Sequence, residues 1–375
     1  MIYLDNAATT KPDGECLENA AQYITQKFYN PSALYAEGYA LHKEISDSRS
    51  HILGFVANDR DYQLIFTSCG TEADNLAVFG GGRRGNVVTT MGEHSAVFAA
   101  VNALKERGVE VRFAPLNADG SVNVSGLFGL IDDRTSLVSV IHVNNETGAV
   151  NDVNNIASAV KKINARTLFH SDGVQAFGKI PFKLGDCIDF YSISAHKIGG
   201  VKGTGALIKH KNKVLKPLIY GGGQEDGLRS GTENVFGIKM FEFAAVKRYH
   251  SLDENYALVS KLHDLMAEKL DKSLFNIISG ENSSPYILCV AAKGVRGEII
   301  LHEADDRGLI IGTGSACSSN DKKRYSRVIL SCGIEESEAD GVLRLSFSPE
   351  NTESETETAA AILNETVKRR KEIME

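Results

Sequence analysis

The chain has 375 residues and a formal net charge of −7, so it can bury a large core and has no overall basic field to hold nucleic acid. No apolar run approaches the roughly 20 residues of a membrane-spanning helix, and the first residues do not resemble a secretory signal. Six cysteines without a C-x-x-C pair argue against a disulfide framework and a structural zinc site. We therefore expect a cytoplasmic protein with no metal and no membrane association.

Strand-like runs alternate with helical patterns through the first two thirds of the chain. Helical spacing of apolar residues marks Ala96–Arg107 and Asn154–Ala165. This alternation predicts an α/β fold with a largely parallel sheet covered on both faces. No helical pattern separates the last two runs, so we expect one antiparallel pair there. The predicted strands are Gln63–Thr67, Asn86–Thr90, Val109–Phe113, Ser136–His142, Thr167–Ser171, Asp189–Ser194 and Gly205–Lys209.

The last third has a different pattern. Phe236–Leu270 is one long helical stretch that leads into strands at Tyr286–Ala291 and Val342–Ser346, and Glu353–Met374 predicts a closing helix. We therefore predict a large domain over residues 15–250. A smaller α+β domain would combine residues 1–14 with residues 251–375.

Lys197 is the first candidate for chemistry. It stands in Ser194–Lys197, directly after a predicted strand and before a glycine-rich stretch. A lysine that forms a Schiff base needs such a rigid, partly desolvated position, because its amine must be available in the neutral form. From this segment alone, a surface lysine in a turn fits equally well.

Other polar groups also follow predicted strands. Gly70 and Thr71 begin a helix, where free backbone N–H groups suit a phosphate, although a plain helix cap has the same pattern. Asp172 could pair with a protonated ring nitrogen and keep the ring an electron sink. His94 could stack on the ring or be structural, and Asn145 could reach a ring oxygen.

The ordered set of motifs resembles the cysteine desulfurase family, within the class V aminotransferase group of fold-type I pyridoxal-phosphate enzymes. The resemblance runs from residue 3 to about residue 348, and it implies a large domain with a mainly parallel seven-stranded sheet. The motifs that carry it are Leu4–Thr10, Asn30–Ser32, Thr67–Asn75, Glu93-His94, Asn144–Gly148, Asp172–Gln175, Ser194–Lys197, Arg229–Thr232 and Gly314–Cys317.

The resemblance implies a role for each matching residue. Lys197 would bind pyridoxal 5'-phosphate covalently, His94 would stack on its ring, and Asp172 would pair with its nitrogen. Asn145 and Gln175 would face the ring oxygen. Asn145 and Arg344 would bind the substrate, whose carboxylate Arg344 would clamp. The phosphate would be held by Gly70, Thr71, Ser194 and His196, together with Thr232 of a neighbouring subunit in a homodimer.

Cys317 is the expected working thiol. It lies in the small, polar stretch Gly312–Asn320, which we interpret as flexible, and the nearby Lys322–Arg324 could favour its thiolate. The resemblance implies that L-cysteine is converted to L-alanine while its sulfur passes to Cys317 as a persulfide. The other five cysteines are interpreted as packing residues.

The sulfur acceptor stays open between an iron–sulfur scaffold and a tRNA-thiolating enzyme. Tyr35 stands where the family commonly has histidine, and we assign it no catalytic role. The chain also stops soon after its closing helix, without the tail that some relatives use to dock a scaffold. Two alternatives remain: a selenocysteine lyase or other class V enzyme, and a non-catalytic partner-binding subunit.

Overall fold

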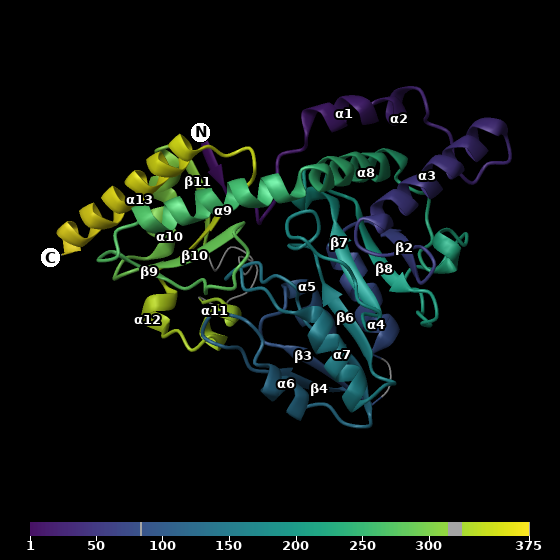
Figure 1. The fold of residues 1–375 in the computed structure, drawn as a ribbon, viewed down its shortest axis with the longest axis horizontal. Helices are drawn as coiled ribbons and strands as arrows, with labels where there is room; N and C mark the ends of the chain where they lie inside the picture. Colours follow the sequence, from purple (N-terminus) through teal and green to yellow (C-terminus); the bar gives the residue numbers. More distant parts are fainter. Residues whose placement is uncertain (83–84, 314–324, 375) are drawn as a thin grey trace.

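The computed structural model describes residues 1–82, 85–313 and 325–374, in two lobes built around two sheets (Figure 1). The lobe at the right of Figure 1 carries seven strands, and the lobe at the left carries five and holds both chain termini. None of the helices in these described ranges is long and apolar enough to cross a membrane.

The seven-stranded sheet is mainly parallel, as predicted. Its order is β2-β8-β7-β6-β5-β3-β4, and only β8 runs antiparallel to its neighbours β2 and β7. The expected antiparallel pair, β7 and β8, is confirmed, and the turn between these strands contains Lys197. The strands are β2 (Tyr62–Thr67), β3 (Asn86–Thr90), β4 (Glu110–Ala114), β5 (Thr135–Ser139), β6 (Leu168–Asp172), β7 (Phe190–Ser194) and β8 (Gly205–His210).

Alternate residues of each strand point to opposite faces of this sheet, and helices cover both. Leu64 and Phe66 of β2 pack in the core that includes α3, α7 and α8, whereas Ile65 packs in the core of α4. Helix α5 packs on the same face as α4. The helices of this lobe are α1 (Gly14–Ala20), α2 (Gln22–Thr25), α3 (Ala36–Gly54), α4 (Gly70–Gly81), α5 (Ser95–Glu106), α6 (Val124–Gly129), α7 (Val153–Ile163), α8 (Val235–His250) and the single-turn 3₁₀ helices η1 (Ala195–Lys197) and η2 (Glu225–Gly227).

The five-stranded sheet has the order β1-β11-β12-β10-β9. Helices α9, α10 and α13 pack on one of its faces, and α11 and α12 lie against the other. The predicted strands near residues 286–291 and 342–346 and the predicted closing helix are present. The elements are β1 (Ile2–Leu4), α9 (Leu252–Lys269), β9 (Phe275–Ile277), β10 (Ile287–Ala292), α10 (Gly297–Asp306), β11 (Leu309–Thr313), α11 (Arg327–Ser331), α12 (Glu336–Ala339), β12 (Val342–Ser346) and α13 (Glu353–Met374).

Three predicted elements differ from the structure. Strand β5 ends at Ser139 and not at His142, although the N–H groups of Val140 and His142 still donate to the carbonyls of His170 and Asp172 in β6. The long helical stretch is two helices that meet at Ser251, whose backbone is not helical. Gly312 and Thr313, predicted to be flexible, belong to strand β11. The predicted domain boundary falls at Ser251, but the division into domains stays a prediction.

Strand β7 supports Lys197, so its packing can be tested directly. Ile193 is fully buried, and Ile193→Ala should lower the free energy of unfolding by about 2–5 kcal/mol through lost burial and a residual cavity. Chemical denaturation measures this change. Ile373→Ala in α13, where the isoleucine is 66% exposed, is the matched control and should change stability by less than about 0.5 kcal/mol. Equal losses in both variants would contradict the assignment of Ile193 to the core.

Candidate active site

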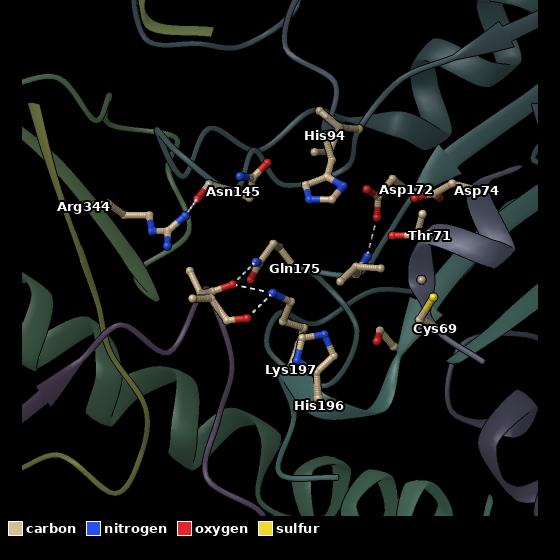
Figure 2. Close-up of a pocket in the computed structure, with 16 residues that line it drawn as sticks. Cys69, Thr71, Asp74, His94, Asn145, Asp172, Gln175, His196, Lys197 and Arg344 are labelled. Atoms are coloured by element: carbon tan, nitrogen blue, oxygen red, sulfur yellow. Dashed lines mark hydrogen bonds between the residues drawn. The ribbon is translucent and has the colours of Figure 1, made fainter. Parts of the chain in front are cut away.

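A cavity of about 300 Å³ lies where strands β2, β3, β6 and β7 give way to the loops and helices that follow them (Figure 2). Ligands of open α/β sheets typically bind outside the carboxyl ends of the parallel strands. The cavity brings together ten predicted residues from distant parts of the sequence. They are Gly70, Thr71, His94, Asn145, Asp172, Gln175, Ser194, His196, Lys197 and Arg344.

Lys197 ends the short 3₁₀ turn after β7. Its Nζ donates hydrogen bonds to the backbone carbonyls of Ala7, at 2.6 Å, and Ala8, at 2.7 Å (Figure 2). The chain turns sharply after the lysine at Gly199, whose φ of +95° favours glycine. The amine is therefore held at a fixed place in the cavity by the N-terminal segment of the chain.

The start of α4 forms one end of the cavity. Gly70 is the first residue of this 12-residue helix, and a Cβ at this position would lie 2.9 Å from Val174 Cγ2. Ser194 Oγ lines the same cavity and is buried, with no hydrogen-bond partner among the described residues. Together with Thr71 and His196, these groups offer N–H and O–H donors at the positive end of a helix, which suits an anion such as a phosphate.

Two carboxyl groups line the cavity beside the start of α4 (Figure 2). Asp172 is buried at the end of β6, and its Oδ1 accepts a hydrogen bond from the Val174 N–H at 2.9 Å. Burial, and secondly the charge of Asp74, raises the pKa of Asp172 to about 7. Burial alone raises the pKa of Asp74 to about 7. A cationic group placed beside this pair would be stabilised by their negative charge.

His94 lies between these features. Its Nδ1 accepts a hydrogen bond from the Ala96 N–H at 3.2 Å and so caps α5. Burial, followed by the positive charges of Lys197 and Arg327, lowers the pKa of His94 to about 4. The imidazole is therefore neutral near pH 7, and a neutral ring can stack on a flat aromatic ligand without placing a charge against it.

Arg344 closes the cavity from the five-stranded sheet. Its Nη1 donates to the Asn145 carbonyl at 3.0 Å, and its Nη2 donates to Asp5 Oδ1 at 2.8 Å. Gly312 on the neighbouring strand leaves room for the guanidinium, because a Cβ there would lie 3.0 Å from Nη2. Arg344 therefore presents a planar, charged donor group at a fixed position, as a carboxylate ligand requires.

Two predicted site residues are not among these ten. Cys317 lies outside the described residues, as do Lys322–Arg324. Thr232 lines a separate cavity of about 140 Å³ beside Arg229 of the same chain. The described chain resumes close to the site, since Ser326 Oγ donates to Glu146 and Arg327 donates to the carbonyls of Met91 and Glu93.

Sequence reasoning missed several groups that line the cavity. Asp74 is buried in the second turn of α4, and the Ala7 and Ala8 carbonyls hold Lys197. The sequence does carry a signal for Asp74, which is a charged residue among the apolar residues on the buried side of α4. For the two alanines the sequence has no signal, because backbone carbonyls are the same in every residue.

The residues present fit pyridoxal 5'-phosphate. An anion site, a buried acidic pair and a fixed lysine amine line one cavity, and Ser194 Oγ is a buried polar atom of its wall that has no partner in the described part of the chain. The phosphate would occupy the Gly70 end, the ring nitrogen would face Asp172, and Lys197 would bind the carbonyl carbon.

Comparison with known proteins agrees with this class of site. The aminotransferase class-V family matches residues 2–358, and the chain belongs to this family. It is accordingly a pyridoxal-phosphate-dependent enzyme with the fold-type I architecture.

Individual relatives are similar over nearly the whole chain. A cysteine desulfurase from Gluconacetobacter diazotrophicus is 34% identical over 96% of this chain and 92% of its own length. Cysteine desulfurase IscS from Clostridium botulinum is 33% identical over the whole chain and 96% of its own length. A solved NifS-like protein superposes with a TM-score of 0.91 at 31% identity, covering 98% of this chain and 99% of that one.

The buried acid Asp74 should make the cofactor-free protein less stable as pH rises. Its folded pKa is raised, so between about pH 4 and pH 7 the unfolded chain loses a proton that the folded chain keeps. Stability therefore falls with rising pH in this window, by up to about 1.4 kcal/mol for each pH unit. Asp74→Asn should lack this fall in stability. The free energy of unfolding of the variant, relative to that of the wild type, should therefore increase from pH 4 to pH 7.

Denaturation of both proteins at a series of pH values measures the difference. Asp306→Asn, which changes an exposed acid at the end of α10, is the control and should follow the wild-type curve. An Asp74→Asn curve parallel to that of the wild type would show that Asp74 titrates normally in the fold.

Proposed function

We propose that this chain is a cysteine desulfurase, which converts L-cysteine to L-alanine and transfers the sulfur to Cys317 as a persulfide. The observation that carries the proposal is the Lys197 amine, fixed in one cavity that the helix start at Gly70 and the buried carboxyl of Asp172 also line. The names of relatives that are similar over nearly the whole chain support the reaction. Within this proposal, residues 15–250 form the cofactor-binding domain, and residues 1–14 and 251–375 form the small domain.

Each residue of the cavity has a separate task. When bound, the cofactor supplies an electron sink for the bond electrons at the substrate's Cα. Lys197 Nζ removes the Cα proton and returns it later in the reaction, because it is the amine fixed inside the cavity. Asp172 maintains the positive charge of the ring nitrogen, and neutral His94 packs against the ring. Asn145 and Gln175 provide polar contacts for the ring oxygen.

The sulfur transfer needs a second nucleophile. The Cys317 thiolate attacks the sulfur of the substrate, so that an S–S bond forms while the substrate's C–S bond breaks. The bond electrons and one proton stay with the carbon skeleton, which leaves as alanine. One thiol and one cysteine thus become one persulfide and one alanine, and no outside oxidant is required.

The partners follow from the same proposal. Thr232 lies away from its own chain's cavity, which supports a homodimer in which it reaches the phosphate of the neighbouring subunit. The persulfide requires a sulfur-acceptor protein, either an iron–sulfur scaffold or a tRNA-thiolating enzyme. The scattered cysteines support a cytoplasmic enzyme, and the net negative charge supports the absence of stable nucleic-acid binding.

Replacement of the thiol tests the proposal. Cys317→Ala should keep the visible absorbance of the cofactor and the spectral change on adding L-cysteine, because the cavity residues are intact. Persulfide formation and sulfide release should fall to background. Cys187→Ala, at a partly buried cysteine away from the cavity, is the control and should retain both activities. Normal turnover of cysteine by Cys317→Ala would refute the assignment of the thiol.

Arg344 should determine affinity for the substrate carboxylate. Arg344→Lys keeps the charge but loses the two-pronged geometry, so KM for L-cysteine should rise roughly tenfold or more, for about 1.4–3 kcal/mol of lost binding. Steady-state alanine formation measures KM and kcat separately. Cysteamine, which lacks the carboxylate, should bind the wild type and Arg344→Lys equally well. A variant with an unchanged KM would place the carboxylate elsewhere.

A further inference from the structure

Lys179 is a buried lysine that the reaction described above does not use. It lies one turn after Gln175, and its side chain is almost entirely shielded from solvent. Nζ donates a hydrogen bond to Gln175 Oε1 at 2.8 Å. Among the residues that the structure describes, no carboxylate lies within ion-pair distance of Nζ. A buried lysine amine without a carboxylate partner is costly, so the presence of Lys179 beside the cavity requires an explanation.

The amide of Gln175 is held at both ends. Its Nε2 donates to the Ala7 carbonyl at 2.9 Å, and this same carbonyl accepts from Lys197 (Figure 2). A carbonyl oxygen can only accept, so the Ala7 contact fixes which end of the amide is nitrogen. Lys179 occupies the Oε1 end. The second N–H of Nε2 is then the group that Gln175, which lines the cavity, can offer to a ligand.

The surroundings of Lys179 are positively charged. Burial lowers the pKa of Lys179 well below its ordinary value, and Lys197, Arg248 and Arg344 lower it further. The ring of Tyr286 lies 5.7 Å from Nζ and is its aromatic neighbour. Lys179 therefore gains little from nearby charge, and its hydrogen bond to Gln175 is its principal polar contact.

We propose that Lys179 is a positioning residue that, by binding Oε1 of Gln175, directs the free N–H of that amide at the anionic ring oxygen of the cofactor. This inference rests on the proposed function, because it assigns a ring oxygen to the Gln175 side of the cavity. Without Lys179 the amide keeps a single anchor at Ala7 and can turn its N–H away from the ligand.

The pH dependence of the cofactor's visible band is a readout that a purely structural role would not change. An N–H donor stabilises negative charge on the ring oxygen. The oxygen then attracts the proton on the nearby Lys197 nitrogen less strongly, so this proton is lost at lower pH. Removal of the donor should keep that proton in place to higher pH. Lys179→Met in the holoenzyme should therefore shift the midpoint of the band upward by about one pH unit.

Two control variants separate position from charge. Lys183→Met removes an exposed lysine four residues further on, whose Nζ binds the Phe55 carbonyl outside the cavity, and it should leave the midpoint unchanged. Lys179→Gln keeps an N–H donor without the charge, and it should stay within about 0.3 pH units of the wild type. A shift in Lys179→Gln as large as that in Gln175→Leu would overturn the proposal, even if the methionine variant failed to fold.

A double-mutant cycle tests whether Lys179 acts through Gln175. Lys179→Met should shift the midpoint in the wild-type background and add no further shift in the Gln175→Leu background. An unchanged midpoint in Lys179→Met, or an equal shift in both backgrounds, would overturn the proposal.

The wild type is the reference for the function itself. A wild type without a visible band or alanine formation would refute the proposed function. A fully active wild type, together with an unchanged pH midpoint in Lys179→Met, would refute only the role of Lys179.

Discussion

The hydrogen bonds from Lys197 to the Ala7 and Ala8 carbonyls are the contacts on which the arrangement of the site depends. The segment that supplies these carbonyls is fixed at both ends. Strand β1 pairs with β11 in the small sheet, and the Asp13 N–H donates to the Gly199 carbonyl in the large lobe. The first thirteen residues thus cross from one lobe to the other beside the reactive amine. Any change in the relation between the two sheets would move these acceptors away from Lys197.

The second constraint is the desolvation of charge around the cavity. Asp74, Asp172 and Glu93 have pKa values raised by burial, while His94 and Lys179 have pKa values lowered by burial. Buried groups of this kind cost stability unless a ligand or partner compensates them. A cofactor that carries a phosphate and a basic nitrogen compensates both the donors at the start of α4 and the buried carboxyl groups. The cavity-lining residues are therefore arranged for a bound ligand rather than for the stability of the empty fold.

Much of this arrangement was predictable from sequence because it follows short-range patterns. The alternation of strands and helices predicted the seven-stranded sheet, and polar residues at strand ends, such as Asp172 and Lys197, predicted which side chains meet. Strand β1 was not predicted, because it has only three residues and is defined by its pairing with β11. Strand β11 was also missed, although its five residues begin with the apolar run Leu309–Ile311. The roles of the Ala7 carbonyl and of Lys179 depend on three-dimensional contacts between segments, and no local pattern indicates them.

The pairing of the N-terminal segment with β12 has a consequence for how the enzyme is made. Asn6 Nδ2 donates to the Ser346 carbonyl across 340 positions of sequence, and Ser346 Oγ accepts from the Ala7 N–H. A nascent chain therefore lacks these contacts of the Ala7 segment until Ser346 has left the ribosome. At roughly 5–20 residues per second, the first residues wait for tens of seconds without their partner strand. Stable cofactor binding should thus follow the synthesis of Ser346, and a chain truncated before Ser346 should retain pyridoxal 5'-phosphate poorly.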